Sequence, residues 1–331
     1  MAGGLQASNL IADGCTDIST VQFEEEFGER MNLQPPFTQM IEQFTKWGGI
    51  AASKYTFPAP DPSVKTEDTT TARGTKIRIY TPDGYTGDKP VCMYYHGGGW
   101  AMGDINAEDA FSRTMSKLGD IVVISVEYGL APENKHADLM NECYQALRWA
   151  LENSKKLNTT EGKFVVSGNS AGGQLAFATA LRAIDDGLGN QLVGLVTLIP
   201  VTVHPDGVPH ELRSKYTSMV EHDQHTINSA NAMRGFWQAF GVSPTDQYGS
   251  PLLHPRLKGL KKVYLAVCGH DTLRDDGLLM KQKLDEAGCD TKMDFYEGYP
   301  HFFFGWPSPK LEEPTKQFFA NVGQGIKFVL S

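Results

Sequence analysis

A G-x-S-x-G sequence at positions 168–172 is the most informative stretch of this chain, and Ser170 lies at its centre. It follows a strand-like apolar run, 163–167, and it opens a helix-like run, 174–178. A sharp strand-to-helix turn needs glycine on both sides of the serine and leaves the hydroxyl exposed at its tip. Ser170 is therefore the candidate nucleophile. Because a chain with 34 glycines can produce such a pentapeptide by chance, other residues must support this interpretation.

A serine with its ordinary pKa is a poor nucleophile and needs a histidine as base, which in turn needs a carboxylate to orient it. Two later strand-like runs end close to suitable residues: Asp271 follows 263–268, and His301 follows 293–296. The order Ser170, Asp271, His301 is the chain order expected of α/β-hydrolases. We expect these three residues to form a catalytic triad.

Other residues compete for the roles of acid and base. Asp275 and Asp276 are alternative acids, but they lie farther into a helix-like run, where acidic residues usually interact with the helix dipole. His270 is an alternative base, but it adjoins Asp271 and we expect its side chain to point elsewhere from the strand end. His96 is another, and we expect it to brace the glycine loop that follows it.

A second glycine-rich segment, 96–100, reads H-G-G-G-W and follows the strand-like run 91–95. An acyl-transfer enzyme must stabilise the oxyanion of a tetrahedral intermediate, and backbone N–H groups about 3 Å from that oxygen do this best. Glycines let the main chain come this close. Alone, the triplet would indicate a flexible turn, but upstream of a serine turn it matches the oxyanion loop of lipases and esterases. Phosphate binding is disfavoured because no Gly-Lys-Ser/Thr follows.

From about Lys76 to the C-terminus the chain resembles the hormone-sensitive-lipase-like branch of the α/β-hydrolases. Besides the two glycine motifs, 128–133 reads Y-G-L-A-P-E where the family has Y-R-L-A-P-E. The segment 271–277 reads D-T-L-R-D-D-G where the family has D-P-L-R-D-E-G. The resemblance implies an α/β-hydrolase fold, with a mostly parallel central sheet flanked by helices and a helical cap.

The resemblance also implies roles for single residues. Gly98, Gly99 and Ala171 would donate the hydrogen bonds of the oxyanion hole beside the triad. Two positions depart from the family pattern: Asn169 replaces the usual Asp before the nucleophile, and Gly129 replaces the usual Arg. The first change removes a negative charge beside the serine turn but keeps a hydrogen-bonding side chain. Neither change removes a member of the triad.

Strand-like and helix-like runs alternate along the chain, which predicts a mostly parallel sheet with helices on both faces. The strand-like runs are 76–80, 91–95, 121–127, 163–167, 192–201, 263–267 and 292–296. The clearest helix-like runs are 138–153, 174–185 and 276–287. We expect a single domain over 1–331, with a cap formed by about 1–60 and about 204–250 over the carboxyl ends of the strands.

Three aromatic residues are candidates for the substrate pocket. Trp100 adjoins the oxyanion loop, whereas Phe236 and Trp237 lie in a helix-like run of the expected cap, 227–240. An aromatic side chain on such a helix more often packs against a neighbouring element than lines a pocket, so Trp100 is the stronger candidate. The aromatic residues and methionines of the cap favour a hydrophobic, small to medium ester or lactone as substrate.

The composition excludes several classes of function. A formal net charge of −9 disfavours nucleic acid as a partner. No run reaches the roughly 18 apolar residues of a membrane helix, and the first residues lack the features of a signal peptide, so we expect a cytoplasmic protein. The five cysteines show no metal-ligand spacing, and we expect no metal and no other cofactor. The expected partner is a small-molecule ester, and the sequence does not decide between a monomer and a homodimer.

Together these features predict a serine carboxylesterase that works through an acyl-enzyme intermediate. An enzyme of the same fold in a biosynthetic pathway, acting as an acyltransferase, dehydratase or cyclase, is the main alternative, since an acyltransferase could keep all three triad residues. A ligand receptor on the same scaffold is a weaker alternative. Some plant hormone receptors resemble this family but have lost the triad histidine, whereas His301 is present here.

Overall fold

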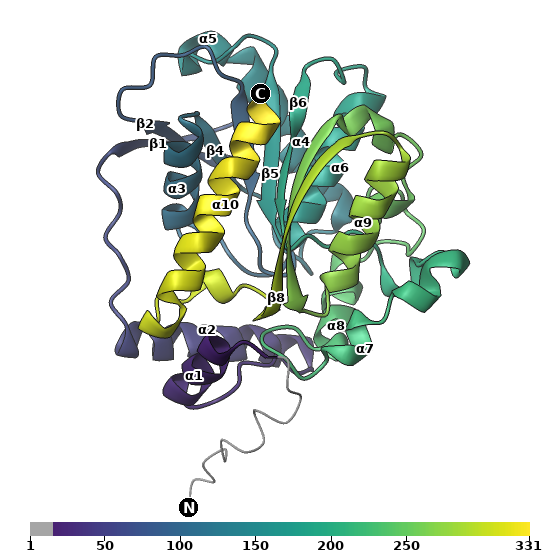
Figure 1. Cartoon of the computed structure of the whole chain (residues 1–331). Coiled ribbons are helices and arrows are strands. Elements are labelled where there is room, and N and C mark those ends of the chain that lie inside the picture. The colour runs from purple at the N-terminus through teal and green to yellow at the C-terminus, as the bar shows by residue number, and fades with distance from the viewer. Residues whose placement is uncertain (1–15) are drawn as a thin grey trace, which may run out of the picture.

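An eight-stranded sheet forms the centre of the computed structural model, which describes residues 16–331 (Figure 1). Residues 1–15, the first part of the expected cap, lie outside the described range. The strand order is β1-β2-β4-β3-β5-β6-β7-β8; β2 pairs antiparallel with β1 and with β4, and the other described strand pairs are parallel. The strands are β1 (Val64–Thr70), β2 (Lys76–Pro82), β3 (Val91–Tyr95), β4 (Val123–Glu127), β5 (Phe164–Asn169), β6 (Leu192–Leu198), β7 (Lys262–His270) and β8 (Asp290–Pro300). The expected mostly parallel sheet is confirmed.

The central strands are mostly apolar and buried because both faces of the sheet are covered. In β3, Val91, Met93 and Tyr95 belong to one buried cluster, whereas Cys92 and Tyr94 belong to the other. Successive side chains of a strand point to opposite faces. A strand that is apolar at every position therefore contributes side chains to the buried cluster on each face of the sheet. All five residues of β3 are buried.

Helices cover both faces of the sheet. On one face, α4, α6 and α9 pack into the buried cluster that contains Val91 and Met93 of β3. On the other face, α3 and the long C-terminal α10, which crosses the front in Figure 1, pack into the cluster that contains Cys92 and Tyr94. The helices are α1 (Ile18–Phe27), α2 (Phe37–Lys54), α3 (Asp109–Gly119), α4 (His136–Glu152), α5 (Ser154–Leu157), α6 (Ala171–Asp185), α7 (Ser218–Glu221), α8 (Ala230–Phe240), α9 (Arg274–Glu286) and α10 (Glu312–Leu330). None of these helices is long and apolar enough to cross a membrane.

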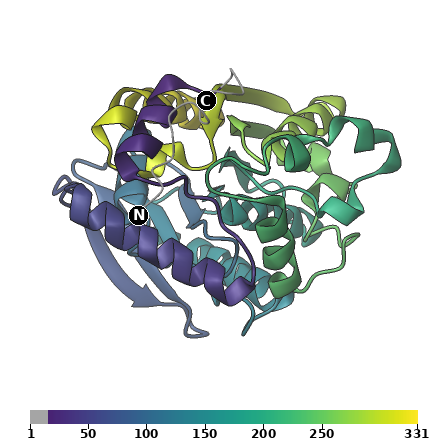
Figure 2. The same cartoon turned by 90° about the horizontal axis from the view of Figure 1, so that it is seen from below.

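Two segments far apart in the sequence meet beyond one end of the sheet. Helices α1 and α2 lie there together with α7 and α8, as Figure 2 shows from below. The backbone N–H of Leu33 donates to Ile227 O at 2.9 Å, and the rings of Phe37 and Phe236 pack edge to face with centroids 6.2 Å apart. Both segments belong to the ranges that we expected to form the cap. That they act together as one cap over the active site stays a prediction.

Candidate active site

The candidate residues follow four strands of the parallel part of the sheet. The glycine loop follows β3, Ser170 follows β5, Asp271 follows β7, and His301 follows β8. Parallel strands end at the same edge, so loops from distant parts of the chain meet there, which is the usual location of ligand sites in open α/β sheets. The structure brings all of these residues to one place.

Ser170 occupies a turn that few residues tolerate. Its φ is 55° and its ψ is −115°, and α6 begins at the next residue. A Cβ on Gly168 would lie 2.1 Å from Gly172 O, and one on Gly172 would lie 2.0 Å from Tyr95 O. Both contacts are far too short, so the two glycines of the motif are required by close backbone packing. A non-glycine residue at positive φ is a strained conformation typical of functional sites.

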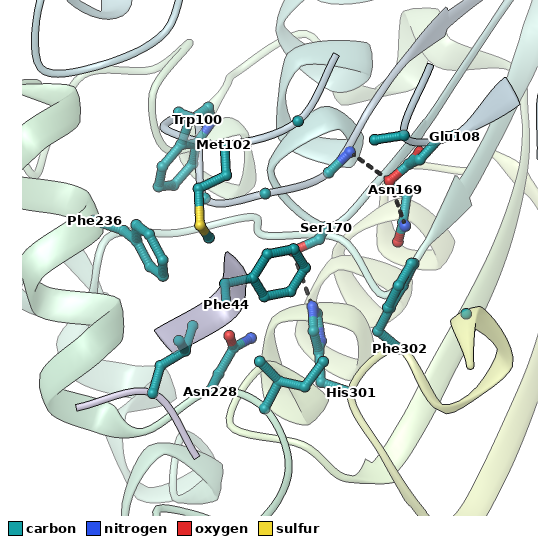
Figure 3. A pocket seen from close by; sticks show the side chains of 18 of the residues that line it. Phe44, Trp100, Met102, Glu108, Asn169, Ser170, Asn228, Phe236, His301 and Phe302 are labelled. Carbon is teal, nitrogen blue, oxygen red and sulfur yellow. Dashed lines mark hydrogen bonds between the residues drawn. The ribbon is translucent and has the colours of Figure 1, made fainter. Parts of the chain in front are cut away.

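The side chains of Ser170, His301 and Asp271 form a continuous hydrogen-bonded chain. His301 Nε2 lies 3.0 Å from Ser170 Oγ, the contact drawn in Figure 3. His301 Nδ1 lies 2.6 Å from Asp271 Oδ2. The second carboxylate oxygen, Oδ1, accepts a hydrogen bond from the backbone N–H of Leu273 at 2.9 Å. All three triad candidates are buried, and the chain has the geometry in which a histidine can take a proton from the serine.

The two rival acids have other partners. Asp275 Oδ2 accepts from the backbone N–H groups of Thr217 and Ser218 at 2.6 and 2.7 Å. Asp276 is fully buried, and its Oδ1 accepts from the backbone N–H of Thr202 at 2.7 Å. Burial raises the pKa of Asp276 to about 7. These carboxylates anchor loops to the start of α9, which leaves Asp271 as the acid that contacts the histidine.

The two rival bases lie apart from Ser170. His96 Nδ1 lies 2.8 Å from Gly97 O, and the hydroxyl of Tyr128 donates to His96 O at 2.7 Å. Burial lowers the pKa of His96 to about 4, so its ring is neutral at pH 7 and braces the glycine loop. His270 is buried and stacks on His225 with ring centroids 4.5 Å apart.

The backbone of the glycine loop adopts positive φ angles and approaches its neighbours so closely that a side chain at Gly98 or Gly99 would clash. Gly98 has a φ of 108°, and a Cβ there would lie 2.2 Å from Met102 O. Gly99 has a φ of 60°, and a Cβ there would lie 2.5 Å from the ring of Phe236. Ala171 is the first residue of α6, and a first-turn N–H has no partner within its own helix. Two glycine amides and this amide are therefore candidates to bind an oxyanion.

Glu108 joins the glycine loop to the serine turn, a role that the sequence did not indicate. Its Oε1 accepts from Gly97 N at 3.0 Å and from Asn169 Nδ2 at 3.3 Å, as Figure 3 shows. The hydroxyl of Tyr94 donates to its other oxygen. Burial raises the pKa of the Glu108 carboxyl, and the three hydrogen bonds oppose this shift. The amide of Asn169, the residue that departs from the family pattern, is one of the donors.

A cavity of about 280 Å³ opens beside Ser170 and His301. Its walls are mostly apolar, and its larger apolar residues are Leu33, Phe44, Phe57, Trp100, Met102, Ile227, Met233, Phe236, Phe302 and Trp306. Trp100 and Phe236 thus line the cavity, in line with the sequence-based expectation. Asn228, which the sequence did not single out, lines it as well. Across residues 16–331, no three His, Cys, Asp or Glu side chains are grouped so that they could hold a metal ion.

Trp237 corrects one expectation, because it does not line this cavity. It packs against Trp100 with ring centroids 4.7 Å apart and borders a separate surface hollow together with His204. Successive residues of a helix point in directions about 100° apart, since there are 3.6 residues per turn. Phe236 therefore faces the cavity, whereas its neighbour lies behind the glycine loop.

Comparison with known proteins supports the α/β-hydrolase fold and the hormone-sensitive-lipase-like branch. Residues 92–305 match the model of a family described as alpha/beta hydrolase fold. The versiconal hemiacetal acetate esterase of Aspergillus parasiticus is 42% identical over 311 residues, which cover 93% of this chain and 96% of the relative. The crystal structure of vibralactone cyclase superposes with a TM-score of 0.82 at 26% identity and covers 95% of both chains.

A further relative is considerably longer than this chain. A protein named FAD-linked oxidoreductase pytB, from Aspergillus terreus, is 44% identical over 277 residues. The match covers 84% of this chain but only 34% of that protein, so the chain spans about a third of its length. With a family model that matches residues 92–305 and relatives that align over two thirds or more of both chains, the chain belongs to the hormone-sensitive-lipase-like branch of the α/β-hydrolase fold family.

Proposed function

We propose that this protein is a serine carboxylesterase that hydrolyses small to medium hydrophobic esters, and acetate esters in particular. The observation that carries this proposal is the chain of contacts from Ser170 through His301 to Asp271, with His301 Nε2 3.0 Å from Ser170 Oγ. An apolar cavity lined in part by the glycine loop lies beside it. These are the parts that acyl transfer to a serine needs.

The geometry supports a two-step reaction. His301 removes the proton of Ser170, whose oxygen attacks the carbonyl carbon of the ester, and the amides of Gly98, Gly99 and Ala171 stabilise the oxyanion. His301 then gives its proton to the leaving alcohol. In the second step His301 activates a water that attacks the acyl-enzyme and releases the acid, while Asp271 holds the ring in one tautomer and stabilises the imidazolium.

The cavity and the relatives support the substrate class. At about 280 Å³ the cavity is near the lower end of the roughly 300–1,000 Å³ that small-molecule sites span, which fits a small to medium ester. The name of the Aspergillus parasiticus relative specifies an acetate ester. An acetyl group is the smallest common acyl group, so most of the cavity would hold the alcohol part.

A lactone-forming enzyme is a second candidate, favoured by the similarity to vibralactone cyclase. In such a reaction a hydroxyl of the acyl group attacks the acyl-enzyme in place of water. The hydroxyl oxygen then bonds to the acyl carbon, His301 accepts its proton, and Ser170 leaves and takes that proton back. Mass spectrometry of products made in ¹⁸O-labelled water distinguishes the two, because hydrolysis puts one labelled oxygen into the acid and cyclisation puts none into the lactone.

Replacement of the nucleophile tests the proposed function. Ser170→Ala should lower kcat with p-nitrophenyl acetate by about 10⁴-fold or more, the usual cost of removing a triad residue. Circular dichroism should show an intact fold. An organophosphonate should label Ser170 and no other serine. A folded Ser170→Ala protein that keeps a tenth of the wild-type rate would overturn the proposal.

A further inference from the structure

The side chain of Asn228 is a buried polar group in a mostly apolar wall. Asn228 lines the cavity beside Ser170, and it is 7% exposed. Figure 3 shows its amide directed into the cavity, which Phe44 also lines. Among residues 16–331 the carboxamide has no hydrogen-bond partner. Its amide atoms are not sealed from solvent as Asn169 Oδ1 is, so a molecule in the cavity can reach them. A ligand that covered the amide without bonding it would leave a buried polar group unpaired, which is unfavourable.

The other polar side-chain atoms of the wall are either paired or sealed from solvent, and the sealed ones include Trp306 Nε1, which has no partner. Ser170 and His301 bond to each other, and Glu108 accepts from the amide of Asn169. Asn169 Oδ1 also lacks a partner, but it is sealed from solvent, so a molecule in the cavity cannot reach it. Of these polar side chains, the Asn228 carboxamide is the one left to bond a ligand.

The backbone around Asn228 is firmly held, which fixes the direction of its Cα–Cβ bond. On one side, Ile227 O accepts from Leu33 N at 2.9 Å, and the hydroxyl of Thr226 donates to Glu24 at 2.6 Å. On the other side, Ser229 Oγ donates to Leu33 O at 2.6 Å. A ligand that bonds a group positioned in advance loses less entropy than one that must order a mobile group.

We propose that Asn228 is a specificity-determining residue that hydrogen-bonds a hydroxyl or carbonyl oxygen on the alcohol part of the ester. A carboxamide carries two donor hydrogens and an acceptor oxygen, so it can bind either group. This inference rests on the proposed function. An acetyl group has no polar atom beyond the reacting carbonyl, so the second polar group must belong to the alcohol. The substrate class is thus an acetate ester of an oxygenated aromatic or other bulky alcohol.

The test compares phenyl acetate with hydroxyphenyl and acetylphenyl acetates. For each substituted ester, kcat/KM is divided by the value for phenyl acetate in the wild type and in Asn228→Leu. Comparing this ratio between the two proteins cancels the intrinsic reactivity of each ester. For at least one substituted ester the ratio should fall about 3–10-fold in Asn228→Leu, the effect of one neutral hydrogen bond. Asn228→Ala should lower it in the same direction if Asn228→Leu does not fold.

Asn231→Leu is the matched control. It makes the same change three residues later, on the exposed surface of α8, and should leave every ratio unchanged. Equal ratios in the wild type and in both Asn228 variants would overturn the role of Asn228.

A binding measurement separates this inference from the proposed function. In Ser170→Ala protein, calorimetry gives the dissociation constants of the same esters, with and without Asn228→Leu. If the wild type hydrolyses none of the esters, the proposed function fails. The role of Asn228 then stands if the substituted esters lose about 3–10-fold in affinity relative to phenyl acetate, and it falls if they do not.

Discussion

His301 Nε2 lies 3.0 Å from Ser170 Oγ, although the two residues are 131 positions apart in the chain. In the sheet, β6 and β7 lie between β5, which precedes the serine, and β8, which precedes the histidine. The segment after β8 must therefore bring the histidine back across the strand ends. Asp271, at the end of the intervening β7, holds its other ring nitrogen, so the position of the base depends on this contact.

The first prediction concerns the acid that orients the base. Asp271→Asn should lower kcat by about 10⁴-fold, as expected when a triad histidine is held in the wrong tautomer. Because Asp271 Oδ1 can still accept from Leu273 N, we expect the loop to keep its shape. Steady-state kinetics with p-nitrophenyl acetate measures the loss, and Asp275→Asn serves as control with a far smaller effect. A larger loss in Asp275→Asn than in Asp271→Asn would identify a different acid.

The sequence predicted the residues that follow directly from strand ends. Each triad candidate and the glycine loop come just after a strand-like run, and parallel strands end at a common edge, so local patterns were enough. The two glycines beside Ser170 were also predictable, because close packing at 2.0–2.1 Å excludes any side chain there. The expected central strands agree with the observed ones within a few residues.

Other elements gave weaker local signals. The edge strand β1 is exposed at most positions, so its sequence lacks the apolar pattern of a buried strand. Helix α10 contains Gly323 and Gly325, and glycine disfavours a helix interior. It forms because its apolar face packs on the sheet and tertiary burial outweighs propensity.

Residues that line the cavity from distant loops could not be found from the sequence. Glu108 acts through contacts with two segments that are 11 and 61 residues away, and Asn228 lies in a loop without a motif. The direction of Trp237 depended on the rotation of α8 about its axis, which packing against Trp100 determines. These features follow from tertiary contacts, which a single sequence does not display.

A second prediction concerns Glu108 as a positioning residue of the oxyanion loop. Glu108→Ala leaves the N–H of Gly97 and the amide of Asn169 without their acceptor. The loop should shift, and kcat should fall about 10–100-fold, less than the roughly 10²–10³-fold lost when an oxyanion donor is removed outright. KM should change little, since the cavity wall stays apolar. Glu108→Gln keeps an acceptor oxygen and should recover most of the rate; equal losses in both variants would contradict this role.

A third prediction concerns stability and pH at Asp276. Burial raises the pKa of Asp276 from its ordinary value of 3.8 to about 7. Between these pH values the folded protein keeps a proton that the unfolded protein has released, so this group lowers the free energy of unfolding as pH rises. Asn cannot titrate. The free energy of unfolding of Asp276→Asn minus that of the wild type should therefore increase as pH rises from 4 to 8. Urea unfolding at several pH values measures this difference.

Asp275 provides the opposite control for this titration. Burial acts to raise its pKa, but hydrogen bonds from Arg274 and from the backbone of Ser218 and Thr217 outweigh it, and the net shift is downward. Its contribution to stability is therefore present above the unfolded pKa and is lost as pH falls. Asp275→Asn should lose stability relative to the wild type as pH rises from about 3 to 6. The same pH trend in both variants would refute the assignment of these shifts.

The last prediction places the selectivity for ester size at Phe236. Its ring lines the cavity and lies against Gly99, where an added Cβ would be only 2.5 Å away. Phe236→Ala removes this wall close to the candidate oxyanion hole and should make room for longer esters. In the proposed mechanism the triad candidates act only on the scissile bond, which every ester presents alike, whereas one methylene in an apolar pocket is worth about 1–3 kcal/mol. The ratio of kcat/KM for octanoate over acetate p-nitrophenyl esters should rise at least about tenfold.

Trp237→Ala is the control that the structure offers for this measurement. Trp237 is the next residue in α8 and is equally buried at 2% exposed, but it lies outside the cavity and packs behind the glycine loop against Trp100. Its loss should destabilise the protein by about 3–5 kcal/mol, as for other large-to-small core changes, without changing the octanoate-to-acetate ratio. Because both variants remove a buried aromatic ring from the same helix, a difference in the ratio cannot come from general loosening of α8. A ratio that moves with Trp237 and not with Phe236 would place the selectivity at the surface hollow by His204 instead.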